Sequence, residues 1–371
     1  MATAINTFIP LFTPDINKKD IEAVAEVIQS GMLVQGKMVA ALEQKTCSYI
    51  GCKHAIAVSS GTATLHLMLH VLGIGKGDEV IIPAFSYIAT ANVVELVGAK
   101  PVFVDIDLNT FNINPNQIEE KITNKTKAIM PVHEFGLPAN MEHILALGEK
   151  HNIPILEDAA CAIGSSWSAG KTGKNSYMAS YSLHPRKAIT SGEGGLICTN
   201  SDSLAKDLRI LRNHGTEILE GQMDFTKAGF NYRMTDFQAA LVLSQFDRLD
   251  DQLAKKRAQA ATYHAKLNAE KYVTPIEPEG ISHAWQTYHV LVQGNRDEII
   301  KELRENGIGT NYGAQCIPAM SFYKNKYKHN CEEEFPNAWK AYSQGLALPL
   351  FSKLTEQEQE KVIQELNSNE K

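Results

Sequence analysis

One lysine in this sequence lies in surroundings that suit covalent chemistry. Lys187 belongs to the stretch SLHPRKAITSGEGG, where it stands between Pro185 and a glycine-rich bend, with a strand-like run close on either side. A lysine that acts as a nucleophile must lose its proton near neutral pH, and partial burial favours that loss. A loop between two core strands would supply such burial, whereas an ordinary exposed loop would leave the lysine charged. The surroundings of Lys187 therefore allow two interpretations, a solvated cation or a reactive amine held in a site.

A carboxylate and a set of anion-binding groups also follow the ends of expected strands. Asp158 ends the run IPILED, where a buried carboxylate is costly unless a cation or several donors meet it. Ser60, Gly61 and Thr62 lie between a strand end and a helix start, where free N–H groups and hydroxyls bind phosphate. Taken alone, each of these groups is also explained by helix capping, the commoner role of such residues.

Together these groups meet the requirements of pyridoxal 5'-phosphate. Its phosphate needs a helix N-terminus, its ring nitrogen needs a carboxylate that keeps it protonated, and its aldehyde needs a lysine. Its ring needs an aromatic stacking face, which Phe85 or Tyr87 supplies in PAFSY, after another expected strand. The sequence therefore predicts a pyridoxal phosphate site that contains residues 60–62, Asp158, Lys187 and one of these aromatic side chains.

Alternating strand and helix patterns are expected to bring these groups together. Several apolar runs lack polar alternation, which indicates strands covered on both faces, and helical patterns lie between them. We predict an α/β fold whose large domain, residues 1–245, holds a mostly parallel seven-stranded sheet flanked by helices, with ligands at the carboxyl ends of the strands. The expected strands are 55–60, 79–84, 101–107, 127–132, 153–158, 179–184 and 195–200.

A change of pattern near residue 234 indicates a second unit. An apolar stripe predicts one long helix from about this point. Residues 246–371 are expected to form a smaller C-terminal α+β domain, with a strand over 287–293, a helix over 296–306, and a last helix capped by Thr355 and Glu358. The apolar stripe consists of Val242, Phe246, Leu249 and Leu253.

The composition argues against several kinds of partner. The chain has 371 residues, of which 44% are apolar and 21% charged, and its net charge of -6 argues against nucleic acid or an acidic membrane surface as the main partner. No apolar run approaches the ~18 residues that span a bilayer, and the first residues lack a secretion signal, so we expect a cytoplasmic protein. The spacing of Cys47 and Cys52 matches no common zinc site, so we expect reduced thiols and no metal.

Seven motifs follow one another along the chain in an order that is specific as a set. They are VSSGTATLHL, PAFSYIATAN, PVFVDID, PVHEFGLPANM, EDAACAIG, SLHPRKAITSGEGG and GFNYRMTDFQAAL. Together they resemble the sugar-nucleotide aminotransferases of the DegT/StrS type, which have the aspartate aminotransferase fold (type I), and the resemblance runs from about residue 8 to the C-terminus. It implies a pyridoxal phosphate enzyme that moves an amino group, usually from L-glutamate, onto a keto-sugar carried by a nucleotide diphosphate.

The resemblance implies roles for the residues that would contact the cofactor ring. Lys187 would bind the aldehyde carbon and transfer protons, Asp158 would face the ring nitrogen, and Tyr87 would stack on the ring. Cys161 departs from the pattern, because the family usually has glutamine or histidine there, close to the ring hydroxyl. A thiol is a poor hydrogen-bonding group, so the electronic properties of the bound cofactor are expected to differ.

The resemblance also implies a phosphate site that two subunits share. Gly61, Thr62 and Ser182 would hold the phosphate, with Ser60 nearby. Asn231, from GFNYRM, would reach the phosphate of the neighbouring subunit's cofactor. A homodimer with shared active sites is therefore expected.

The substrate leaves several alternatives open. The main hypothesis is a UDP- or dTDP-linked keto-deoxyhexose, aminated at C3 or C4 for a bacterial surface glycan such as the O-antigen of lipopolysaccharide. The alternatives within enzymes are a cyclitol aminotransferase or a sugar dehydratase on the same scaffold. An alternative of a different class is a non-catalytic regulatory protein that binds pyridoxal phosphate. Relatives that deoxygenate sugars carry histidine in place of the lysine, so Lys187 disfavours deoxygenation. The segment 307–323 differs in sequence from the corresponding segment of many relatives. We expect it to lie where the sugar or the nucleotide binds.

Overall fold

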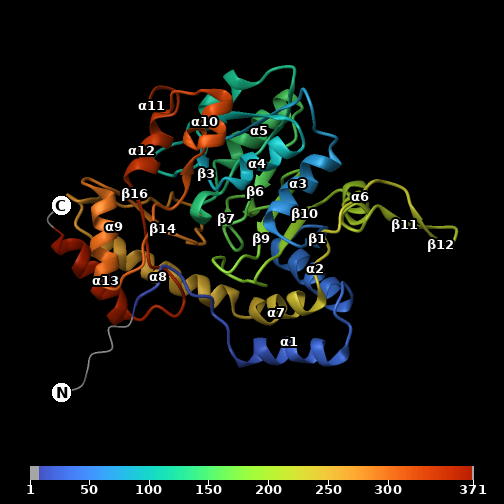
Figure 1. Cartoon of the computed structure of the whole chain (residues 1–371), viewed down its shortest axis with the longest axis horizontal. Coiled ribbons are helices and arrows are strands. Elements are labelled where there is room, and N and C mark those ends of the chain that lie inside the picture. Colours follow the sequence, from blue (N-terminus) through green and yellow to red (C-terminus); the bar gives the residue numbers. More distant parts are fainter. Residues whose placement is uncertain (1–7, 370–371) are drawn as a thin grey trace.

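The computed structural model describes residues 8–369 and consists of a layered body of short buried strands between helices, with a hairpin that extends away from it (Figure 1). Each of the seven predicted strands is present, and each is shorter than predicted because its ends bend into loops. The observed strands are β1 (His54–Val58), β2 (Glu79–Pro83), β4 (Lys100–Val104), β5 (Thr126–Ile129), β6 (Leu156–Asp158), β9 (Met178–Ser182) and β10 (Gly195–Thr199).

These strands do not form the single seven-stranded sheet that we predicted. A four-stranded sheet has the order β1-β10-β9-β6, and a separate three-stranded sheet has the order β4-β2-β5. The first sheet is mixed, because β10 runs antiparallel to β1 and to β9. Between β5 and β6 the pairing is reduced to isolated parallel bridges. Pro131 and Pro154 have no N–H group to donate, so they interrupt the hydrogen-bond ladder at this place.

Helices cover these sheets, and one of them carries the predicted phosphate-binding residues at its start. α3 (Gly61–Val71) packs against β9 and β10. Its apolar residues follow a helical spacing, and Leu65, Met68 and Leu69 are buried while Leu72 is partly buried. The other helices of this part are α1 (Lys18–Ser30), α2 (Lys37–Ile50), α4 (Ala89–Leu96), α5 (Met141–His151) and α6 (Asp202–Arg212).

The long helix predicted from residue 234 is two helices, α7 (Asp236–Phe246) and α8 (Leu249–Lys266). The apolar stripe was read correctly, because all four of its residues are buried. The chain leaves helical geometry at Arg248, with φ -117° and ψ 10°. The Arg248 guanidinium donates to both carboxylate oxygens of Asp20 and to the carbonyl oxygen of Asp15. This ion pair joins residues far apart in the sequence and stabilises the break between α7 and α8. Hydrophobic periodicity does not indicate such a break.

The C-terminal part is built around a small antiparallel sheet, β13 (Tyr272–Val273), β14 (Tyr288–Val292) and β16 (Gly345–Leu348). The strand predicted over 287–293 is β14, and the helix predicted over 296–306 is α9 (Arg296–Glu305). The predicted capping pair Thr355 and Glu358 opens α13 (Glu356–Ser368). This sheet has its own apolar cluster, which includes the end of α8, whereas the domain boundary at residue 245 stays a prediction.

The remaining elements are short. β3 (Phe85–Ser86) pairs with β15 (Gln315–Cys316), β7 (Ser166–Trp167) with β8 (Gly170–Lys171), and β11 (Thr216–Leu219) with β12 (Gln222–Phe225). The β11–β12 hairpin is the extension seen in Figure 1. Helices α10 (Ser321–Tyr327), α11 (Cys331–Glu334) and α12 (Pro336–Gln344) complete the C-terminal part. Within residues 8–369, no helix combines the length and the apolar character needed to cross a bilayer.

Candidate active site

A pocket of about 280 Å³ lies where β6 and β9 end, at their carboxyl ends. This position agrees with the general rule for ligand sites in open α/β sheets. Eight of the nine predicted site residues line it, from segments as far apart in sequence as α3 and the loop after β9. They are Ser60, Gly61, Thr62, Tyr87, Asp158, Cys161, Ser182 and Lys187.

The start of α3 forms an anion cradle on one side of the pocket. Ser60 is the N-cap of α3, and its hydroxyl accepts the N–H of Ala63. The N–H groups of Gly61 and Thr62, in the first turn, have no partner within the helix. Gly61 also approaches the opposite wall so closely that a Cβ atom there would lie 2.8 Å from the Cβ of Ser182. The cradle therefore offers N–H groups, hydroxyls and a narrow space that only glycine permits, which suits a phosphate.

Asp158 lies at the bottom of the pocket, and only 4% of its surface is exposed. Its carboxylate accepts a hydrogen bond of 2.9 Å from the Thr90 hydroxyl and one of 3.2 Å from the Ala160 N–H. Burial raises the pKa of Asp158, while these donors and the charge of Lys187 act to lower it. A protonated ring nitrogen would be a suitable cationic partner for this buried carboxylate.

Lys187 lies on the loop between the buried strands β9 and β10, as predicted. Its Nζ atom is 2.9 Å from the Sγ atom of Cys161, and its backbone N–H donates to the carbonyl of His184. Burial raises the pKa of the Cys161 thiol, while the charge of Lys187 lowers it. The amine therefore lines the pocket and faces a neutral thiol, which favours the interpretation of an amine held in a site.

The loop that carries Lys187 is held by two hydrogen bonds with a glutamine side chain, an arrangement called here the glutamine clamp. Gln245, on α7, accepts the N–H of Thr190 at 3.0 Å and donates to its carbonyl at 2.7 Å. The Thr190 hydroxyl in turn donates to the carbonyl of Leu183. These bonds fix the backbone three residues after Lys187.

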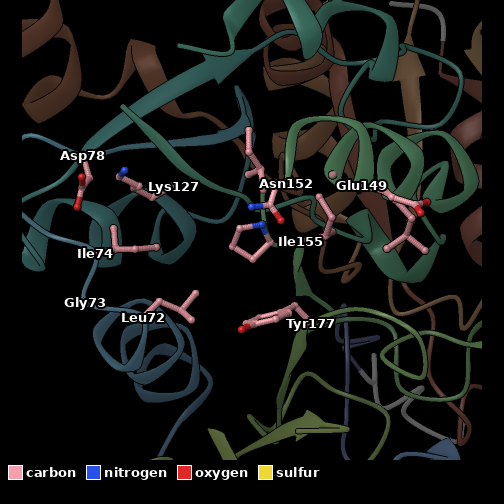
Figure 2. Close-up of a pocket in the computed structure, with 13 residues that line it drawn as sticks. Leu72, Gly73, Ile74, Asp78, Lys127, Glu149, Asn152, Ile155 and Tyr177 are labelled. Carbon is pink, nitrogen blue, oxygen red and sulfur yellow. The ribbon is translucent and has the colours of Figure 1, made fainter. Parts of the chain in front are cut away.

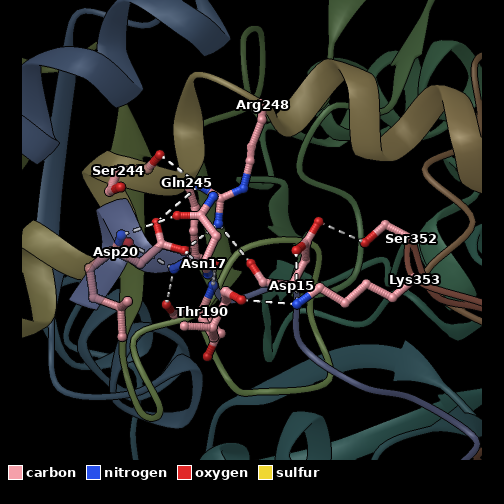
Figure 3. A network of polar contacts seen from close by, with 11 residues as sticks. Asp15, Asn17, Asp20, Thr190, Ser244, Gln245, Arg248, Ser352 and Lys353 are labelled. Carbon is pink, nitrogen blue, oxygen red and sulfur yellow. Dashed lines mark hydrogen bonds and ion pairs between the residues drawn. The ribbon is translucent and has the colours of Figure 1, made fainter. Parts of the chain in front are cut away.

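The clamp belongs to a larger polar network at the α7–α8 junction (Figure 3). Asp20 is fully buried. Burial acts to raise its pKa, but hydrogen bonds from Arg248 and Ser244 outweigh this and lower it. Asp15, next to this pair, accepts from Ser352 and forms an ion pair with Lys353. The N-terminal segment, the lysine loop and the C-terminal part thus meet around one buried ion pair.

The two aromatic candidates have different positions. Phe85 is fully buried in the core, whereas Tyr87 is 58% exposed and lines the pocket. Tyr87 is therefore the aromatic side chain available to a ligand. The predicted substrate-side segment 307–323 also reaches the pocket, through Gly313 and Ala314.

Several pocket residues escaped the sequence reasoning. Thr90 donates a hydrogen bond to Asp158, and Glu134 contributes a buried carboxyl group. Neither was predicted as a site residue, although they lie within the motifs PAFSYIATAN and PVHEFGLPANM. Ser86 and Glu193 also line the pocket. The available signal for Glu134 was an ionisable residue, next to His133, shortly after the apolar strand β5.

Asn231 does not line the pocket of its own chain. Its side chain is exposed, and its backbone forms an isolated bridge with Asn213. The nearby Arg233 donates to the Asn213 side chain at 2.6 Å, and Arg212 is a buried partner of Glu43. These two arginines therefore have structural contacts, and the role of Asn231 stays a prediction.

A second cavity, of about 690 Å³, lies at the opposite edge of the sheets (Figure 2). Asp78, Lys127 and Ile155 line it at the amino ends of β2, β5 and β6. Although larger, this cavity contains none of the predicted site residues. Among residues 8–369, no group of His, Cys, Asp or Glu side chains is arranged to hold a metal ion.

The residues of the first pocket fit pyridoxal phosphate, because an anion cradle, a buried carboxylate and a shielded lysine meet there. The model of the DegT/DnrJ/EryC1/StrS aminotransferase family matches residues 14–367. The chain belongs to this family. Its members depend on pyridoxal phosphate, and they include sugar aminotransferases.

Solved structures agree with this membership. The Streptococcus pneumoniae protein Spr1654 in its PLP form is 29% identical, with a TM-score of 0.92, over 97% of this chain and 98% of that chain. DesV of S. venezuelae is 31% identical, with a TM-score of 0.88, over 94% and 93%. Helicobacter pylori PseC, an aminotransferase involved in the biosynthesis of pseudoaminic acid, is 26% identical, with a TM-score of 0.91, over 97% and 98%. The predicted family and cofactor are therefore confirmed.

Proposed function

We propose that this sugar aminotransferase moves the amino group of L-glutamate onto the 3- or 4-keto group of a deoxyhexose linked to UDP or dTDP, for a bacterial surface glycan. The observation that carries this proposal is the meeting of Lys187, Asp158 and the α3 anion cradle in one pocket. The family membership supports a sugar as the amino acceptor. Gly313 and Ala314, from the segment expected on the substrate side, line the same pocket.

The proposed chemistry follows from the positions of three side chains. Pyridoxal phosphate, when bound, supplies the electron sink and carries the amino group between the two substrates. The Lys187 amine would bind the cofactor covalently at rest and, once displaced by the amino donor, would take a proton from one carbon and return it to another. Asp158 would hold the proton on the ring nitrogen, and Tyr87 would cover one face of the ring.

The presence of Lys187 also bears on the alternatives. A sugar dehydratase of this type uses histidine at this position, so the lysine favours transamination. The complete set of Lys187, Asp158 and Asn231 argues against a regulatory protein that only binds the cofactor.

We further propose that the active form is a homodimer in which Asn231 reaches the partner's phosphate site. The β11–β12 hairpin supports this, because it exposes Ile218, Met223 and Phe225, each by more than 60% of its surface. Apolar side chains gathered on one extension are typical of an interface. The proposed dimer would cover them.

The dimer proposal has a direct test. If the proposal is correct, the Lys187→Ala and Asn231→Ala variants are each inactive alone. A dimer with one subunit of each variant has one active site in which both residues are intact. With random exchange of subunits, the mixture should recover about a quarter of the wild-type activity. A mixture that stays inactive, in a sample shown to contain mixed dimers, contradicts the shared site.

The substrate is tested by incubating the protein with L-glutamate and a panel of nucleotide-linked keto-sugars, with identification of the product by mass and NMR. We expect an aminated sugar nucleotide and 2-oxoglutarate. The colour of the protein provides a first measurement, since glutamate should bleach its visible absorption. A stable yellow colour with every amino donor would support the regulatory alternative.

A further inference from the structure

Glu134 is a buried carboxyl group that the proposed chemistry does not yet use. It lies in the pocket wall, only 5% of its surface is exposed, and its Oε2 atom has no hydrogen-bond partner among residues 8–369. An unpaired buried acid costs stability, so such a group in a ligand pocket indicates a missing partner.

The backbone around Glu134 is strained and firmly held. The next residue, Phe135, has φ 54°, in the left-handed region that non-glycine residues rarely adopt. The N–H of Glu134 donates to Asn112, the N–H of His133 to the carbonyl of Asp158, and the carbonyl of Phe135 accepts from the Gln286 N–H. Strain that is held by so many bonds is typical of functional sites. It presents the Glu134 carboxyl to the pocket in a fixed position.

The charged and titratable groups that face Glu134 show which side of the pocket it occupies. Burial raises the pKa of Glu134 to about 8, the Asp158 charge adds to this, and the Lys187 charge and the Ser86 hydroxyl lower it. The Glu134 charge in turn raises the pKa of Cys161. At neutral pH, Glu134 is therefore mostly a carboxylic acid that can donate a hydrogen bond.

The covalent structure of pyridoxal phosphate then leaves one edge of the ring for Glu134. The aldehyde and the ring nitrogen are opposite each other, so with the proposed roles the ring would lie between Lys187 and Asp158. The phosphate arm occupies one edge and would lie at the α3 cradle. The other edge carries the ring hydroxyl, and Glu134 and Cys161 both line the pocket and each interact electrostatically with both Asp158 and Lys187.

We propose that the Glu134 carboxyl donates a hydrogen bond to the ring hydroxyl oxygen of the bound cofactor, a contact for which the thiol of Cys161 is poorly suited. This inference rests on the proposed roles of Lys187 and Asp158. It makes Glu134 a positioning residue that stabilises negative charge on the oxygen and thereby weakens the hold on the proton of the nitrogen joining Lys187 to the cofactor.

The test compares Glu134→Leu, which cannot donate, with Glu134→Gln, which can. Cofactor affinity is measured by titrating the cofactor-free protein with pyridoxal phosphate, and the pKa of the Lys187-linked nitrogen by following the visible absorption of the loaded protein against pH. For Glu134→Leu we expect an affinity about tenfold lower and a midpoint about one pH unit higher. Glu134→Gln should stay within about twofold in affinity, with a midpoint near that of the wild type. Glu305→Leu, an exposed glutamate on α9, is the matched control.

Two results would overturn the inference. One is a Glu134→Leu variant with the affinity and the midpoint of the wild type. The other is an equal shift of the midpoint in Glu134→Gln and Glu134→Leu. Such a result would show that the charge of Glu134 determines the midpoint and that its ability to donate a hydrogen bond does not. Should Glu134→Leu fail to fold, Glu134→Ala gives the same comparison. No sugar substrate is needed, so a wrong proposal about the sugar would leave these measurements unaffected.

Discussion

Replacing one buried lysine should make this protein more stable. Lys256, on α8, is only 2% exposed, and its Nζ atom has no hydrogen-bond partner among the described residues. Burial, helped by the charge of Lys187, lowers its pKa from 10.5 to about 8, although Cys161 acts in the opposite direction. At pH 7 the side chain is therefore still charged, in a place that disfavours charge.

The size of the effect follows from this shift. A fall from 10.5 to about 8 corresponds to roughly 3 kcal/mol of destabilisation when the amine is protonated. The cation–π contact with the Phe12 ring, whose centre is 5.4 Å from Nζ, offsets roughly 1–2 kcal/mol of this cost, since such contacts are stronger when buried. Lys256→Met keeps most of the aliphatic packing, so it should raise the free energy of unfolding at pH 7 by about 1–2 kcal/mol.

The pH dependence distinguishes this explanation from better packing. Because the folded pKa is lowered, the unfolded chain binds more protons between about pH 8 and 10.5, and the wild type gains stability as the pH rises through this window. The advantage of Lys256→Met should therefore fall toward zero by about pH 10.5. Urea unfolding at pH 7, 8.5 and 10, with saturating pyridoxal phosphate, measures both quantities. Lys255→Met, the exposed neighbour, is the control. A loss of stability in Lys256→Met at pH 7, or a gain that does not change with pH, would refute the reasoning.

Three further substitutions test the site itself. Asp158→Ala should retain the fold but reduce turnover by about 10²-fold or more, because the ring nitrogen loses its partner; wild-type rates with bound cofactor would show that the assignment is wrong. Gly61→Ala places a Cβ atom 2.8 Å from the Cβ of Ser182 and should weaken pyridoxal phosphate binding about tenfold, as measured by absorbance titration, whereas unchanged affinity would contradict the narrow cradle. Gln245→Leu removes both bonds to Thr190 and should lower the free energy of unfolding by about 2–4 kcal/mol; a urea midpoint equal to that of the wild type would show that the clamp is dispensable.

The strands and the site were predictable to different degrees. Strand positions followed from unbroken apolar runs such as the one before Asp158, because burial on both faces leaves a mark in the sequence. Sheet continuity did not, since it depends on backbone hydrogen bonds, and the effect of Pro131 and Pro154 appears only once the neighbouring strands are known. The break at Arg248 was hidden for a similar reason, because its cause, Asp20, lies more than two hundred residues away.

The site could be predicted where single residue types meet a chemical need. Lys187, Asp158 and Gly61 were predicted because few other residues could fill the roles proposed for them, and all three line one pocket. Glu134 was missed because its importance depends on what surrounds it. A glutamate in a strand-end motif is ordinary until its carboxyl is found buried and without a partner.

The polar junction between Asp15, Arg248 and Lys353 joins the first and last parts of the chain. A ribosome makes Asp15 before the lysine loop and Lys353 well after it, so the polar support beside that loop is incomplete until residue 353 has been synthesised. We therefore expect capture of vitamin B6 to follow synthesis of this later segment rather than accompany synthesis of the lysine loop.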